Sequence, residues 1–234
     1  MTKDAILQEL RKLGLESYRK VIRKHGAPDS CLGVKIEELK KIQKRVGTNH
    51  ELALALYDTG IYDAMYLAGL IADDMKMTPE MLQRWVEGAC RPLIGSTVAW
   101  VTAGSPQGWE VALRWIDSDR ELEAASGWAA LGSIVSVRPD DALDIKGLKR
   151  LLQRVQREIH GAPNWVRQQM NGFVIAVGCY VAPLTEAALE SGARIGSVPV
   201  DVGNTECRIP LAADAIRKVE ARGSIGKKRK SAKC

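Results

Sequence analysis

The chain is organised as pairs of short helical segments that follow one another with no predicted strand between them. Apolar residues recur at helical spacing in each segment, and the segments end at glycine, proline or clusters of polar residues. In each pair the first segment is amphipathic and charged, whereas the second is rich in Ala, Gly and Ser among large apolar residues. We therefore expect the second segments to have close neighbours on several sides. The pairs are 50–60 with 61–74, 78–90 with 96–106, 108–119 with 120–137, and 144–162 with 164–181.

Helical pairs that recur every few dozen residues favour an all-α solenoid, a superhelix of HEAT-like antiparallel pairs. Three further helical segments, at 2–14, 17–26 and 33–47, precede the pairs. An irregular helical bundle is the alternative, but the solenoid needs no long crossover connection. A chain of 234 residues suits a single domain, which we predict over residues 1–221.

One stretch near residues 195–210 interrupts the helical pattern. Val198, Val200 and Val202 alternate there with Pro199, and Gly203 follows. Because proline and glycine disfavour a helix interior, we expect a short extended segment or an ordered loop against the last helices. One more helix is predicted at 211–223.

Two segments begin with helix-capping residues. Thr78 precedes Pro79, so its side chain is predicted to cap the helix that follows. Asn164 follows Pro163 and is predicted to cap the long helix that runs to residue 181.

The positive charge of the protein is concentrated at its C-terminus. Residues 222–234 hold six of the 34 basic residues and no acid, so the other 28 basic residues equal the 28 acidic ones. A basic tail indicates a polyanionic partner such as nucleic acid, and a solvated, disordered end is the alternative. The candidate DNA-binding residues in this tail are Lys227, Lys228, Arg229 and Lys230.

Signatures of the common hydrolases and nucleotide enzymes are missing from the sequence, which contains no GxSxG, Walker loop, HExxH, or GxGxxG after a strand. The three histidines, His25, His50 and His160, fall near predicted helix ends. We therefore expect no His-based metal site.

The five cysteines are scattered and form no CxxC pair, which argues against a disulfide framework or a zinc site. Cys31, Cys90 and Cys179 are expected to be small buried apolar residues. Whether Cys207 and Cys234 meet is left open.

No stretch of the sequence has the length of uninterrupted apolar residues that a membrane helix needs, and the N-terminus lacks the apolar block of a signal peptide. A protein of the cytoplasm that does not enter a membrane is the default expectation.

The chain has six tryptophans but only one phenylalanine. On second segments, Trp100, Trp128 and Trp165 are candidates for stacking on a base or sugar, with core packing as the alternative. On first segments, core packing is expected for Trp85, Trp109 and Trp115.

Polar donors lie on two of the predicted helices. Arg167 and Asn171 share a helix face and Gln168 lies beside it, so the three could donate to phosphate oxygens or base edges. Lys35 begins a lysine-rich helix whose basic side could contact phosphates.

Several segments resemble the AlkD-like DNA alkylation repair proteins, from about residue 31 onward: GVKIEELKKIQKRVG, ELALALYDTGIYDAMYLAGLIAD, LRWIDSDRELEAASGWAAL and the ending VEARGSIGKKRKSAKC. The resemblance implies a curved array of HEAT-like repeats with duplex DNA on a basic concave face. It also implies, for active members, a monofunctional glycosylase that excises alkylated purines without a cofactor, in a bacterial cytoplasm and at most associated with the nucleoid.

The residues that this family uses for catalysis are not found at the matching positions. The catalytic aspartate belongs on the segment STVAWVTAG, where Trp100 is the one aromatic residue and no acid occurs between Arg91 and Pro106. The family's arginine and second tryptophan are likewise missing, with Gly127 and Phe173 near their places. We therefore expect a DNA-binding member of the family and leave catalysis and its residues unassigned. The alternatives are a non-catalytic binder of DNA structure or damage, and a HEAT-type protein-interaction scaffold.

Overall fold

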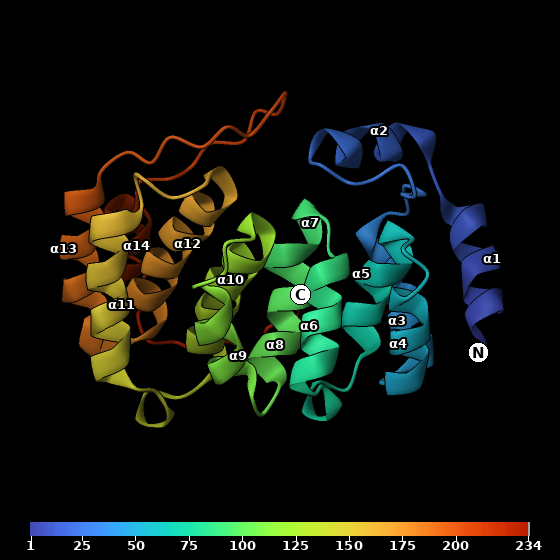
Figure 1. Cartoon of the computed structure of the whole chain (residues 1–234), viewed down its shortest axis with the longest axis horizontal. Coiled ribbons are helices and arrows are strands. Elements are labelled where there is room, and N and C mark those ends of the chain that lie inside the picture. The colour runs from blue at the N-terminus through green and yellow to red at the C-terminus, as the bar shows by residue number, and fades with distance from the viewer. Residues whose placement is uncertain (234) are drawn as a thin grey trace.

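The computed structural model describes residues 1–233, which form helices and connecting segments but no β-strand. The helices stack side by side in chain order from one end of an elongated array to the other (Figure 1), which confirms the predicted all-α superhelix. The α-helices are α1 (Lys3–Leu13), α2 (Glu16–Lys24), α3 (Ile36–Val46), α4 (His50–Tyr57), α5 (Tyr62–Ile71), α6 (Pro79–Gly88), α7 (Arg91–Leu93), α8 (Ala99–Gly104), α9 (Gly108–Trp115), α10 (Glu121–Val137), α11 (Ile145–Glu158), α12 (Asn164–Tyr180), α13 (Thr185–Ile195) and α14 (Ala212–Glu220). A π-helical turn, η2 (Ile94–Val98), joins α7 to α8, and 3-10 turns lie at η1 (Asp74–Lys76), η3 (Asp140–Ala142) and η4 (Ala182–Leu184).

The second helices of the pairs form a continuous inner row. We use the term second helices for α5, the α7–η2–α8 run, α10 and α12, each of which packs against the next. α10 also packs on α9, the first helix of its own pair. A Cβ atom at Gly127 would lie only 2.8 Å from the Ala112 carbonyl oxygen of α9, so glycine is needed for this approach. The small residues of the second helices therefore serve close packing between helices.

Tryptophans of the first helices fill the space between pairs, as predicted. Trp85 and Trp115 are buried, and Trp109 is half-buried against the core. The Trp85 ring stacks on Tyr57 with 4.1 Å between ring centroids. The indole N–H of Trp115 donates to Gln83 at 2.8 Å, so its polar atom is satisfied in the core.

A buried carboxylate attaches the N-terminal part of the chain to the array. Asp63 on α5 is fully buried and accepts hydrogen bonds from the backbone N–H groups of Leu32 at 2.6 Å and Val34 at 2.7 Å. Gly33 between them has φ +82°, and a Cβ there would lie 2.5 Å from the Leu15 carbonyl oxygen. The segment that leads into α3 is therefore fixed by one side chain of α5.

Of the two predicted helix caps, one is confirmed and one is wrong. The Thr78 hydroxyl accepts from the N–H of Met81 at 3.3 Å, and Pro79 is the first residue of α6. Asn164 is instead the first residue of α12, and Pro163 precedes it. The Asn164 side chain bonds to the backbone N–H and carbonyl of Asp201, at 2.7 and 2.8 Å.

Residues 196–211 form neither helix nor strand, as predicted, and extend from α13 over α12 toward α2 (Figure 1). Asn164 holds this segment near its middle, and Asn171 of α12 holds its end by donating to the Pro210 carbonyl oxygen at 3.0 Å. Two asparagines of one helix thus place the segment along the array.

Among the described helices, no single one is long and apolar enough to cross a membrane. α12 and the stretch Ala182–Ile195 meet the length and composition criteria only when taken together, and they are bent by 117° where they join.

Asp63→Ala is expected to destabilise the fold, because it leaves two buried N–H groups without an acceptor. We expect the free energy of unfolding to fall by about 2–4 kcal/mol, measured by urea denaturation. Asp58→Ala, at the exposed end of α4, is the control and should cost less than about 1 kcal/mol. An Asp63→Ala protein as stable as the wild type would contradict the anchoring role.

Candidate nucleic-acid interface

Two adjoining cavities lie along the second helices. The first, of about 290 Å³, lies between α7, the start of α12 and the 196–211 segment, and the second, of about 200 Å³, lies between α10 and α12. Gly95 and Gln169 line both cavities, so we treat the two as one groove. The groove residues are His25, Arg91, Pro92, Gly95, Trp128, Ala129, Gly132, Ser133, Ser136, Trp165, Gln168, Gln169, Gly172, Phe173, Ala176, Tyr180, Val202, Thr205, Cys207 and Arg229.

The helical run along one wall of the groove contains the π-helical turn. The sequence predicts a helix from Ser96, but helical structure begins at Arg91 and passes through the turn at Ile94–Val98. π-helical turns inside α-helices occur frequently at functional sites. Here Gly95 of the turn and Arg91, four residues earlier, both line the groove.

Arg91 packs against an aromatic ring and a glycine. Its guanidinium lies 4.2 Å from the centroid of the Trp165 ring. A Cβ at Gly26 would come within 2.9 Å of the Arg91 Nε atom, so the side chain also packs closely on this glycine. Burial lowers the pKa of Arg91 from its ordinary value, but an arginine stays charged near neutral pH. No ion pair to Arg91 is found among residues 1–233, so its N–H groups are available to a phosphate or a base edge.

The sequence identified Trp165 as a candidate and missed Arg91. A single arginine before a proline carries no pattern of its own. The available signal was its position at the start of the STVAWVTAG helix, four residues before Gly95.

The structure corrects the predictions for Trp100 and Trp128, because both are buried. Trp100 is 5% exposed and packs edge-on against Tyr66, with 5.4 Å between ring centroids. Trp128 is 0% exposed and packs against Phe173 at 5.2 Å. Neither ring offers a free face on which a base could stack.

Of the three polar candidates on α12, only Gln168 lines the groove. Asn171 is 2% exposed and donates to the Pro210 carbonyl oxygen, so its expected role at the groove edge is corrected to a structural one. Arg167 is half-buried outside the groove, and its Nε atom has no partner among the described residues.

The basic tail is docked along the array and is not a free end. Lys228 Nζ donates to the Val135 carbonyl oxygen at 2.9 Å and pairs with Asp140 at 2.8 Å. Lys233 Nζ donates to the Ala72 carbonyl oxygen at 2.8 Å and pairs with Asp74 at 2.7 Å. We call residues 224–233 the C-terminal strap.

The strap crosses the C-terminal ends of three second helices. Lys228 contacts the end of α10, and Lys233 contacts the end of α5. In addition, the backbone N–H of Gly226 donates to the Cys179 carbonyl oxygen of α12, and that of Arg229 donates to the Ser136 carbonyl oxygen of α10. Carbonyl groups at helix C-termini lack partners within the helix and attract cations. The two lysines therefore act inside the molecule, which corrects the expectation that Lys228 is a free DNA-binding residue.

The remaining basic candidates lie on the surface. Lys227 and Lys230 are exposed in the strap outside the groove. Lys35 is exposed at the start of α3, and its Nζ atom lies 3.7 Å from Glu37 Oε1. Their contact with DNA stays a prediction.

The groove is free of carboxylates. Neither Asp nor Glu occurs among the described residues that line it, whereas two arginines do, Arg91 and Arg229. The residues that line the groove therefore offer an anion positive charge, and the nearest opposing charge is that of Asp201, which acts electrostatically on Arg91 from beside the lining residue Val202.

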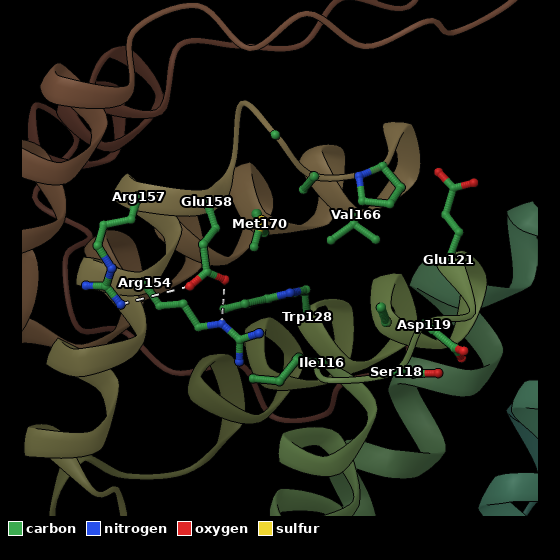
Figure 2. A pocket seen from close by; sticks show the side chains of 14 residues that line it. Ile116, Ser118, Asp119, Glu121, Trp128, Arg154, Arg157, Glu158, Val166 and Met170 are labelled. Carbon is green, nitrogen blue, oxygen red and sulfur yellow. Dashed lines mark hydrogen bonds and ion pairs between the residues drawn. The ribbon is translucent and has the colours of Figure 1, made fainter.

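A larger cavity, of about 410 Å³, lies on the other side of Trp128 (Figure 2). Arg154 lies over the Trp128 ring and pairs with Glu158 at 2.7 Å and with Asp117 at 2.6 Å. Figure 2 shows Arg154 and Arg157 both directed at Glu158. Asp119 and Glu121 also line this cavity and have no ion pair among residues 1–233, so its lining holds three acids against two arginines and suits a DNA phosphate less well than the groove does.

In the described part of the chain, no three His, Cys, Asp or Glu side chains come together to hold a metal ion. Cys31 and Cys179 are buried, Cys90 is half-buried and Cys207 is exposed in the groove. The question whether Cys207 meets Cys234 lies outside the described residues.

The array and its groove place the chain among the HEAT-like repeat proteins. A solved structure from a new family of proteins related to the HEAT-like repeat DNA glycosylases, with affinity for branched DNA structures, is 35% identical, covers 100% of both chains and has a TM-score of 0.93. The model of the DNA alkylation repair enzyme family matches residues 6–197, and the chain belongs to this family. It is also 32% identical over 228 residues to uncharacterized proteins of Listeria monocytogenes and Listeria innocua, over 95% of this chain and 99% of each relative.

The contact between Lys233 and Asp74 can be tested by titration. Burial raises the pKa of Asp74 to about 6, and the Lys233 ammonium opposes this rise. Lys233→Ala should therefore raise the pKa of Asp74 further, as measured by NMR of the carboxyl carbon, and Lys230→Ala should leave it unchanged.

The raised pKa of Asp74 makes the stability of the folded protein depend on pH. An unfolded aspartate has a pKa of about 3.9, so the folded protein binds the extra proton at higher pH than the unfolded chain does. The contribution of Asp74 to stability thus increases as pH falls from about 6 toward 4. In Lys233→Ala the upper limit of this pH window should rise while its lower limit, set by the unfolded chain, stays the same. An unchanged pKa of Asp74 would contradict the docking of the strap.

Proposed function

We propose that this protein binds DNA in the groove, prefers branched DNA to plain duplex, and does not excise alkylated bases. The observation that carries the proposal is the charge of the groove, which contains two unpaired arginines and no carboxylate.

The lack of a carboxylate bears directly on catalysis. Cleavage of a glycosidic bond develops positive charge on the sugar, and enzymes stabilise that charge with a nearby carboxylate. The helical run that forms one groove wall has no Asp or Glu between Arg91 and Pro106. Membership of the repair family is therefore compatible with loss of the family's reaction.

Binding of DNA is supported by the chemistry of the groove residues and by a relative. Arg91 stacked on Trp165, together with Gln168, presents donors suited to phosphates and base edges. A relative of 35% identity over the whole chain has affinity for branched DNA. An aromatic–guanidinium pair can contact bases that are unstacked at a branch point.

The first test compares DNA structures. Fluorescence anisotropy should show tighter binding to a four-way junction than to a duplex of equal length, and both affinities should fall as salt rises. Incubation with DNA that carries 7-methylguanine or 3-methyladenine should release no free base. Release of base would establish a glycosylase, and a lack of binding to any DNA at low salt would favour a protein-interaction scaffold.

The second test removes Arg91. Arg91→Ala should weaken junction binding about tenfold, because one guanidinium contact is lost. Arg84→Ala is the matched control, since Arg84 is an exposed arginine of α6 paired with Asp58 outside the groove. Because Arg91 also packs on Gly26, the thermal unfolding midpoint is measured for each variant. Equal junction affinity of Arg91→Ala and Arg84→Ala would remove Arg91 from the interface.

A further inference from the structure

We propose that the C-terminal strap supplies the groove with a phosphodiester-binding residue, Arg229, and that its neighbouring lysines serve to hold that residue in place. The inference rests on the proposed function and assigns one contact of the DNA backbone.

The strap is attached on both sides of Arg229. Lys228, directly before it, bonds to Asp140 and to the end of α10, and Lys233, four residues after it, bonds to Asp74 and to the end of α5. The backbone N–H of Arg229 itself donates to the Ser136 carbonyl oxygen at 2.8 Å. The backbone at this position is thus tied to the end of α10, so the side chain needs little further ordering to bind a ligand.

The guanidinium of Arg229 differs from the two lysines in having no internal partner. It is exposed, and none of the hydrogen bonds or ion pairs found among residues 1–233 involves it. Each of the two lysines instead pairs with one carboxylate and one backbone carbonyl. Because no described residue pairs with this exposed guanidinium, its charge is available to an external anion.

The cavity beside Arg229 has room for a phosphate group against its floor. A Cβ at Gly172 would meet no atom within 4 Å, and a Cβ at Gly132 would come no closer than 3.6 Å to another residue. The small floor lets a DNA backbone approach the helices closely. Ser133 and Gln169 add a hydroxyl and an amide in the same cavity, both of which donate to phosphate oxygens.

The position of Arg229 relative to Arg91 favours a DNA strand over a single small anion. Arg91 and Arg229 line the two cavities that share Gly95 and Gln169. One strand that follows the groove can therefore meet both guanidinium groups, each of which binds an oxyanion in a planar, bidentate manner.

The experiment compares two adjacent basic residues of the strap on the four-way junction. Arg229→Ala should lower affinity about tenfold and make the slope of log affinity against log salt shallower by about 1. The sequence pattern makes Lys230 a DNA-binding candidate too, whereas the groove assigns the contact to Arg229 alone, because the exposed Lys230 side chain lies outside the groove. Lys230→Ala should therefore stay within about twofold of the wild type, as expected for an exposed charge that makes no direct contact and is screened by salt. The thermal unfolding midpoints of both variants should match the wild type, since neither side chain has an internal partner.

The outcomes separate this inference from the proposed function. If the wild type binds the junction and Arg229→Ala binds equally well, the inference alone is overturned. If Lys230→Ala loses as much affinity as Arg229→Ala, the effect is general tail charge and the placement of Arg229 in the site is wrong. If the wild type binds no DNA, the proposed function fails and this inference fails with it.

Discussion

Close packing of the second helices is the constraint on which the rest of the structure depends. α10 approaches α9 so closely that Gly127 admits no side chain, and α10 also lies against α8 and α12. Other small residues of α10 and α12, among them Gly132 and Gly172, form much of the groove floor, where an added Cβ would meet no atom closer than 3.6 Å. Such a floor cannot itself carry long cationic side chains, so the groove takes its positive charge from elements at its margins: Arg91 at the start of α7 and Arg229 on the C-terminal strap.

The C-terminal strap has two roles, because it ties helices of the array together and it holds the charged Arg229 at the groove. It contacts the ends of α12, α10 and α5, which belong to three different pairs. In a solenoid, each pair otherwise contacts only its neighbours. A segment that spans several pairs therefore restrains the curvature of the array, and with it the shape of the groove.

Periodicity in the sequence predicted the helices, their pairing and the non-helical stretch near 195–210, since each depends on local pattern. Prediction failed where distant residues decide the outcome. The contact of Lys233 with Ala72 joins positions 161 residues apart, and no local pattern indicates it. Trp100 and Trp128 are candidates for stacking because they lie on second segments, but the small residues around them allow a large ring to be buried, which was the alternative. Asn171 failed for a related reason, as its partner Pro210 lies on another element.

The electrostatics of the groove bear on which chemistry it can support. An alkylated purine is cationic, and the transition state for its excision places positive charge on the sugar. Two unpaired guanidinium groups, with no carboxylate among the lining residues, repel both the cationic base and the positive charge that develops on the sugar. The same charges favour the polyanionic DNA backbone. Excision therefore requires a carboxylate beside the sugar in addition to basic groups for the phosphates, and the residues that line this groove include only the basic groups.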